Sequence, residues 1–459
     1  MRLLLLLFFV FIGVGLFSQD MLLSRDSSIV IGEIIVSGNN KTKTNIILRE
    51  MFLKKGDTVS PSQLKQKIEL SREFIFNTTL FVDVKVEAAK QDSNKVAIII
   101  LVKERWYIFP LPYFKLIDRN FNEWWVNQNR DLNRVNYGIK FYHNNLTGSN
   151  DRLNIWLITG YNQQISLRYD KPFCNKKLTN GFSIGITQST QKEVNFQTDS
   201  FNKQQFFNVT NNFAKKYTRI DAAFSMRPDK NYRHTFKMGY STEKIADSVA
   251  IKNPNYYGNA TTTLSYVDIA YSLQYFNTNY NAYPVKGFIG SFNFYHRGFD
   301  NSSNFTQVSA AILLARPISR KLFIRNETAA AIKFPYSSNF VNQNLFGYGN
   351  FQLRGLENYV VDGMVGIENK FTLGCELFTK YLKLPIKSNT YNKIPFKFYG
   401  KIFTDVGYAY NPYVNYNLLN NKIMYTYGVG LDIVTIYDIV LKFEFGFNQL
   451  GGRSLYIER

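Results

Sequence analysis

The sequence predicts a mainly β protein, in which a transmembrane antiparallel β-barrel of about 16 strands follows one small α+β domain. Three observations predict this fold class. An apolar run free of charge opens the 459-residue chain, residues 29–104 mix strand and helix patterns, and residues 105–459 alternate apolar and polar positions.

Residues 1–18, MRLLLLLFFVFIGVGLFS, have the form of a secretory signal peptide. Arg2 precedes an apolar run from Leu3 to Phe17 that is too short to cross a membrane comfortably as a helix. Beyond it, no stretch of about 18 uninterrupted apolar residues occurs. We therefore expect an exported protein without a helical anchor.

Residues 29–104 predict one small domain in the order strand, helix, helix, strand, strand. The first helix follows the turn at GNN and is expected to place four apolar side chains on one side, namely Ile47, Leu48, Met51 and Phe52. Ser60 and Gln63 predict a capping box at the start of the second helix, and Pro61 suits its first turn. Its apolar stripe is Leu64, Ile68 and Ile75.

From residue 105 to residue 459 the helical period is absent and a two-residue period replaces it. In DRLNIWLITGY, Leu153, Ile155 and Leu157 oppose Arg152 and Asn154. An apolar face opposite a face of charge and glycine suits lipid outside and water inside. The aromatic content of 16% suits strands that end in aromatic girdles. The last clear strand closes near residues 447–450, which leaves residues 448–459 as a short tail or a strand extension.

The formal charge of +21 comes from 55 Lys and Arg against 34 Asp and Glu. Nucleic acid is the usual partner of so basic a chain, but an exported chain rarely meets it, and the basic residues here are dispersed. We expect no nucleic-acid partner. A solvated lumen, surface loops and contact with anionic lipid head groups account for the charge instead.

The sequence favours neither a metal site nor an enzyme. His143, His234 and His296 are too scattered for a metal centre, and Cys174 and Cys375 are too few for a disulfide framework. An outer-membrane lipase or acyltransferase would need a serine nucleophile with its partners, but neither a GxSxG pattern nor a credible Ser-His-Asp group occurs. A GxxxxGK[ST] phosphate loop is also missing, so we expect no cofactor and no ATP-driven step.

The domain at residues 29–104 resembles a POTRA (polypeptide-transport-associated) domain, through its element order and the segments GNNKTKTNIILRE and LFVDVKVE. The resemblance implies a periplasmic module that receives client chains.

The barrel region resembles the BamA/TamA superfamily, in the style of Bacteroidetes-type members. Four segments carry this resemblance in the same order, namely NNLTGSNDRLNIWLITGY, AYPVKGFIGSFNFYHRG, LRGLENYVVDG and FTDVGYAYNP. That superfamily also includes two-partner-secretion transporters.

The resemblance implies a functional loop. In the superfamily, the arginine of a (V/L)RG(F/Y) motif lies at the tip of the sixth extracellular loop, which folds back into the barrel and pairs with acidic residues of the inner wall. The matching motif here is Leu353, Arg354, Gly355 and Leu356, where leucine replaces the usual aromatic residue. The run FGYGN, with Gly347 and Gly349, precedes it.

The two-residue period predicts which wall residues face this loop. In FKFYGKIFTDVGYAY, Asp405 and Gly407 share the inner face, so Asp405 is the expected partner of Arg354. Glu376 is a second expected acidic partner, and Glu368 ranks after it. Arginine suits this role because its planar fork can bind a carboxylate through two hydrogen bonds.

Together these patterns predict an outer-membrane assembly factor with its POTRA domain in the periplasm. Unfolded outer-membrane or surface proteins are the expected clients, accessory lipoproteins are expected partners, and a weakly closed seam between the first and last strands would help insert or translocate clients. The alternative is a two-partner-secretion transporter that exports one dedicated passenger. The single POTRA domain, without a preceding plug helix, disfavours that alternative.

Overall fold

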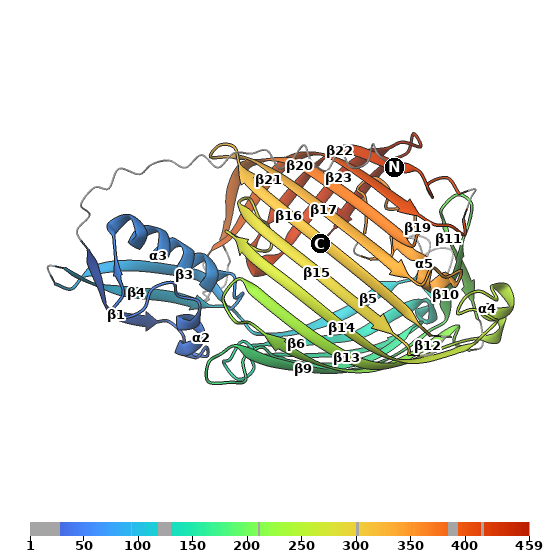
Figure 1. The fold of residues 1–459 in the computed structure, drawn as a ribbon, viewed down its shortest axis with the longest axis horizontal. Helices are drawn as coiled ribbons and strands as arrows, with labels where there is room; N and C mark the ends of the chain where they lie inside the picture. The colour runs from blue at the N-terminus through green and yellow to red at the C-terminus, as the bar shows by residue number, and fades with distance from the viewer. Residues whose placement is uncertain are drawn as a thin grey trace.

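The computed structural model describes residues 28–458 except 93, 118–129, 210–211, 300–302, 350, 384–392 and 415–416. The signal peptide predicted at residues 1–18 lies outside the described residues. A small N-terminal domain lies against one end of a large curled sheet (Figure 1). We call this the near end of the barrel and the opposite end the far end.

The N-terminal domain consists of β1 (Ile29–Ser37), α2 (Thr44–Arg49), β2 (Thr58–Val59), α3 (Pro61–Phe76), β3 (Phe81–Lys90) and β4 (Lys95–Glu104). Its sheet has the order β2-β1-β4-β3, with β1 parallel to β4. The capping box at α3 is confirmed, because Ser60 accepts the Gln63 N–H and the Gln63 side chain caps the Ser60 N–H. The short strand β2 is an addition to the predicted order.

The first helix departs from the prediction. It ends at Arg49, so Met51 and Phe52 follow the helix instead of lying on its face. Ile46 and Ile47 are its buried residues, whereas Leu48 is 39% exposed, so placing Leu48 on the buried side was wrong. Because the helix is only six residues long, Met51 lies in the segment after it and reaches the core from there.

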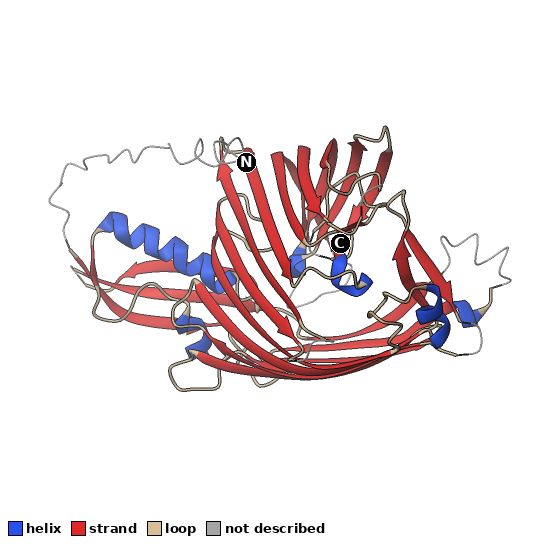
Figure 2. Cartoon of the chain, turned by 45° about the vertical axis from the view of Figure 1, so that its right-hand side comes forward, coloured by secondary structure: helices blue, strands red, loops and turns tan. Residues whose placement is uncertain are grey.

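The large sheet has 16 strands, which confirms the predicted antiparallel barrel architecture (Figure 2). The strands are β5 (Ile108–Leu116), β6 (Val135–Asn144), β7 (Arg152–Gly160), β8 (Gln163–Lys171), β9 (Asn180–Gln191), β12 (Lys215–Met226), β13 (Tyr232–Ile245), β14 (Thr263–Thr278), β15 (Gly287–Arg297), β16 (Phe305–Pro317), β17 (Leu322–Phe334), β20 (Val365–Lys383), β21 (Lys393–Tyr410), β22 (Ile423–Val434), β23 (Val440–Asn448) and β24 (Arg453–Glu458).

Loops at the far end carry the remaining elements. These are β10 (Glu193–Thr198), β11 (Gln204–Asn208), α4 (Asp247–Lys252), α5 (Phe340–Gln343), β18 (Asn344–Phe346) and β19 (Val361–Asp362). Two 3-10 turns, η2 (Leu132–Arg134) and η3 (Ile436–Asp438), complete the described elements. None of the helices in the described part of the chain has the length and apolarity needed to span a membrane.

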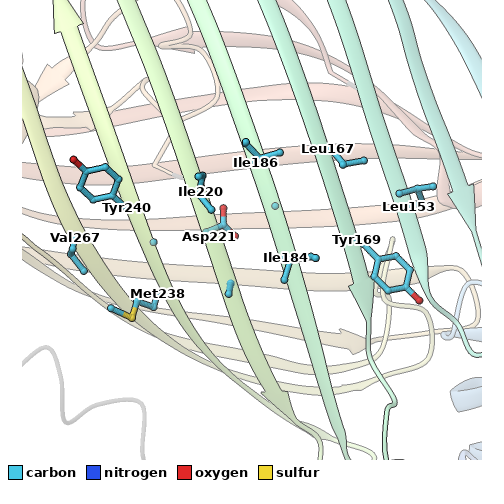
Figure 3. A pocket seen from close by; sticks show the side chains of 13 residues that line it. Leu153, Leu167, Tyr169, Ile184, Ile186, Ile220, Asp221, Met238, Tyr240 and Val267 are labelled. Carbon is cyan, nitrogen blue, oxygen red and sulfur yellow. The ribbon is translucent and has the colours of Figure 1, made fainter.

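Side chains of the large sheet alternate between an apolar outer face and a mixed inner face. On β21, Ile402 and Val406 are exposed, whereas Lys401, Phe403 and Asp405 between and beside them are buried. Part of the outer face is a shallow apolar hollow of about 620 Å³. Figure 3 shows the side chains that line it, among them Leu167, Ile186 and Ile220. This pattern is the one that a lipid-facing barrel wall requires.

Backbone pairing does not close the sheet among the described residues. The first strand, β5, pairs with β6, and the last strand, β24, pairs with β23, but β5 and β24 do not pair with each other. Residues 453–458 thus form a strand of their own after a turn. Side chains span the near end of this seam, where Arg105 donates to both carboxylate oxygens of Asp438 at 2.6 and 3.2 Å.

The N-terminal domain is fixed to several turns at the near end. The buried Glu50 accepts two hydrogen bonds from Arg227, at 2.8 and 2.9 Å. Arg49 donates to the Leu178 carbonyl at 2.6 Å, and the Lys43 N–H donates to the Gly148 carbonyl at 2.9 Å. These contacts come from turns that are far apart in sequence, so the domain rests on a broad part of the rim.

Candidate functional site

The loop that joins β17 to β20 forms a closed neck before it reaches its tip. Strands β18 and β19 pair Asn344 with Asp362 and Phe346 with Val361. Gly347 has φ +79°, and its N–H donates to the Phe351 carbonyl at 2.8 Å. That backbone conformation is one that glycine adopts without strain. The neck therefore directs the chain into the tip that carries Arg354.

Arg354 is bound to the inner wall by its main chain and its side chain together. Its backbone N–H and its Nε each donate to Asp405 at 2.9 Å, and a second guanidinium nitrogen binds the other carboxylate oxygen. A further guanidinium N–H donates to the Thr372 hydroxyl at 2.9 Å. The guanidinium also lies 4.2 Å from the centre of the Phe403 ring. Asp405 has no exposed surface, so this ion pair is screened from water.

The tip also contacts the last strands of the sheet. Gly355 has φ +90°, and its carbonyl accepts a hydrogen bond from Asn448 of β23 at 2.8 Å. Glu357 accepts hydrogen bonds from the Gly355 N–H at 2.7 Å and from the Ser454 hydroxyl of β24 at 2.8 Å. A Cβ added at Gly446 would lie 2.8 Å from the Gly355 Cα. The tip thus joins β21 to the edge strand β24.

Apolar packing supports the two leucines of the motif. Leu353 and Leu356 are buried in one cluster with Phe346 and Phe351. A Cβ added at Gly407 would lie 2.9 Å from the Leu353 side chain, so glycine leaves the space that this leucine occupies. By contrast, Gly349 has open space around it, so packing does not require glycine there.

The structure brings some of the expected wall residues to Arg354 and leaves others away from it. Asp405 lies at the centre of the contacts. Glu368 touches the loop but not Arg354, since it accepts the Gln352 N–H at 3.0 Å and pairs with Lys370 at 3.0 Å. Glu376 faces inward but lies four residues along β20 from Thr372, about 14 Å away at the usual rise of a strand. Neither glutamate is therefore a second acidic partner of Arg354, so the expectation for Glu376 was wrong, and Glu368 binds the loop only through the Gln352 backbone.

Sequence reasoning missed Asn202, which holds the same loop from the opposite side of the barrel. This residue lies at the tip of the β10–β11 hairpin, is fully buried and has φ +58°. Its side-chain amide donates to the Val360 carbonyl at 3.0 Å and to Asn420 at 2.7 Å, and its Oδ1 accepts the Leu419 N–H at 2.8 Å. Beside it, the Lys203 ammonium lies 3.6 Å from the centre of the Tyr359 ring.

Three loops that are remote in sequence therefore meet at Asn202. The only local signal for this arrangement is the residue type, because asparagine tolerates a left-handed backbone at a hairpin tip. Asn448 and Ser454 were missed for a related reason, since the sequence did not show that the tip reaches the last two strands.

These contacts attach the loop to the inner wall of the barrel, and we call the contacts of Arg354 with Asp405 and Thr372 the Arg354 joint. Asp405, Thr372 and Asn448 orient the loop through directional hydrogen bonds. A buried group of three charged residues on the same wall joins Lys401 to Asp432 at 2.6 Å and to Glu444. Among the described residues, no three His, Cys, Asp or Glu side chains are grouped as a metal ion would require. Cys174 and Cys375 are unpaired thiols.

Comparisons with known proteins concern the family and the fold of the chain. The POTRA family, described as surface antigen variable number repeat, matches residues 29–105, and the Omp85 superfamily domain matches residues 145–447. Over 75 residues the chain is 39% identical to the outer membrane protein assembly factor BamA of Neorickettsia risticii, a match that covers 16% of this chain and 10% of that relative.

Two solved structures share the fold over 94% of this chain. BamA from Haemophilus ducreyi lacking POTRA domains 1–3 has a TM-score of 0.51 at 14% identity, with 83% of that chain covered. CdiB from Escherichia coli has a TM-score of 0.52 at 10% identity, with 75% covered. At these identities the likeness concerns the fold alone.

Proposed function

The chain belongs to the Omp85 superfamily, and on that premise we propose that it is an assembly factor of the bacterial outer membrane. Its N-terminal domain faces the periplasm and receives unfolded outer-membrane or surface proteins, aided by accessory lipoproteins. The barrel then helps to insert or translocate these clients through its lumen or its seam.

The unpaired seam carries this proposal. Backbone donors and acceptors of β5 and β24 have no strand partner across the seam among the described residues. An unpaired edge is costly in hydrocarbon, so an incoming client strand is favoured there as a partner. The Arg354 loop reaches β24 through Glu357 and Ser454, which places the joint at the same edge.

The N-terminal domain offers a matching edge. In its sheet, β3 is a terminal strand that pairs only with β4 among the described strands. An extended client segment can add to such an edge through main-chain hydrogen bonds, which require no particular client sequence. A client could then pass from one unpaired edge to another without an energy source other than its own folding.

The test is catalysed folding in proteoliposomes. A urea-unfolded outer-membrane barrel protein is added to vesicles with and without the purified full chain, and folding is followed by heat-modifiable gel mobility. We expect faster insertion into the vesicles that contain the chain. Equal rates in both would contradict the proposal.

The alternative function is export of one dedicated passenger. Such a passenger would need a clear lumen, whereas the Arg354 loop and the β10–β11 hairpin meet inside the far end of the barrel. Depleting the protein from cells separates the two functions. Loss of many outer-membrane proteins supports assembly, and loss of a single secreted polypeptide supports export.

A further inference from the structure

A second candidate site lies on the outside of the near end, where the N-terminal domain meets the first strand. It is a surface hollow of about 570 Å³ whose lining includes Lys41, Lys103, Trp106, Ile108 and His143. The Arg354 joint, by contrast, lies inside the barrel. The hollow adjoins β5, one edge of the unpaired seam.

The polar lining presents positive charge. Within the described part of the chain, neither Lys41 nor Lys103 is held in a side-chain ion pair. The one carboxylate of the lining, Glu104, accepts backbone N–H groups from Lys41 at 2.9 Å and Thr42 at 2.6 Å, and so fixes the segment that carries Lys41. Arg105 is neutralised by Asp438.

His143 adds a polar atom without a partner. It lies opposite Ile108 in the β5–β6 register, and its Nδ1 is buried without a hydrogen bond among the described residues. Burying such an atom costs free energy unless a partner satisfies it. The lining of the hollow therefore includes a histidine whose buried ring nitrogen lacks a hydrogen-bond partner among the described residues.

The apolar lining is continuous with the lipid-facing wall. Trp106 is 63% exposed, and beyond it Phe114 and Ile139 are exposed on the outer face of β5 and β6. A large exposed indole is costly in water but favourable at a membrane interface, where its ring meets head groups and chains together. The hollow thus lies where the apolar wall begins.

We propose that this hollow binds a phospholipid of the leaflet nearest the N-terminal domain. The phosphate lies between Lys41 and Lys103, and the acyl chains follow Ile108 and the outer face of β5 past Trp106. Cations beside an apolar strip that already faces lipid suit a phospholipid better than a polypeptide. The bound lipid fixes the depth of the seam between β5 and β24 in the bilayer. This role is the same whether the seam serves insertion or export.

The test measures lipid retained by the full chain. The protein is purified from nanodiscs that contain phosphatidylglycerol and phosphatidylethanolamine, and bound phospholipid is counted by native mass spectrometry. Lys41→Gln with Lys103→Gln should weaken retention by about 30-fold, since two attractions near a membrane surface are lost. Lys85→Gln with Lys90→Gln, on exposed residues of β3 outside the hollow, is the matched control and should retain lipid.

Two further arms make the result specific. Phospholipids brominated near the head group should quench the Trp106 emission, obtained by difference from Trp106→Phe, in the wild type but less in the Lys41/Lys103 variant. Excess inorganic phosphate should not displace the lipid, because it lacks the chains. Equal retention in all variants, equal loss in both lysine pairs, or displacement by phosphate would each overturn the proposal. Heat-modifiable mobility verifies that every variant is folded.

Discussion

Asp405 binds Arg354 twice over, because it accepts the backbone N–H of this arginine as well as its guanidinium. The loop is therefore attached by its main chain and cannot swing away while the side chain alone stays bound. A carboxylate without exposed surface depends on this partner for its charge balance.

Removing the arginine should destabilise the barrel. Arg354→Ala leaves the Asp405 charge buried and unpaired, which costs about 3–5 kcal/mol. Arg354→Lys keeps the charge but loses the fork, so it should recover only part of the loss. The measurement is the urea midpoint of unfolding in lipid vesicles. Unchanged midpoints and unchanged client assembly for Arg354→Ala would refute the claim that the contact of Arg354 with Asp405 stabilises the barrel.

We expect Gly446 to be as important for holding the loop against the wall as the motif at residues 353–356. Gly446→Val places side-chain atoms where the Gly355 backbone lies, so we expect the loop to leave the wall. Gly349→Ala is the control, because an added Cβ meets open space there. Protease cleavage of the loop reports the displacement. Equal resistance of the two variants would show that the tip does not pack on β23.

Asn202 should close the far end of the lumen. Asn202→Ala removes hydrogen bonds to Val360, Asn420 and Leu419, at a cost of about 1–3 kcal/mol for the buried groups left unsatisfied. We expect higher ion conductance in planar bilayers without loss of the folded barrel. The neighbouring Phe201→Ala removes a side chain that is 63% exposed and should leave conductance unchanged. If both variants conduct like the wild type, Asn202 does not secure the loop.

The ion pair between Arg105 and Asp438 should hold the near end of the seam. A double-mutant cycle of Arg105→Gln and Asp438→Asn is expected to give a coupling of about 0.5–3 kcal/mol in the free energy of unfolding. Asparagine suits position 438, where φ is +60°. Additive effects of the two substitutions would mean that the pair contributes nothing across the seam.

Glu73 of α3 should destabilise the N-terminal domain at neutral pH. Burial raises the pKa of its carboxyl group, and the charge of Glu69 adds to this effect. The folded domain then binds the proton more tightly than the unfolded chain, so stability falls as pH rises through the unfolded pKa toward the folded one.

Glu73→Gln should therefore slow amide hydrogen exchange in α3 at pH 7 and give no gain below about pH 4. The gain is small, because a half-buried charge is partly screened by water. Slower exchange in the variant at both pH values would point to packing instead of charge.

The face that a residue occupies could be predicted from sequence, but its height along the barrel could not. The two-residue period placed both Asp405 and Glu376 on the inner wall, because side chains alternate strictly along a strand. Which of them meets Arg354 depends on how deeply the loop descends, and that depth is set by packing of Leu353 and Leu356 within the barrel.

Contacts between loops also could not be predicted from the sequence. Asn202, Val360 and Leu419 come from three connections that carry no shared period, so no pattern pairs them. The final strand was ambiguous for another reason. Residues 453–458 are short, and only their pairing with β23 shows them to be a strand.

Thiol labelling at position 356 tests most directly whether the Arg354 loop is held in the lumen by Asp405. In a background of Cys174→Ser and Cys375→Ser, Leu356→Cys introduces one thiol at a buried site of the tip. A membrane-impermeant maleimide should label it slowly, and Asp405→Asn should accelerate labelling by about 100-fold, as loss of about 3 kcal/mol implies. Rapid labelling that is the same with and without Asp405→Asn would contradict the account.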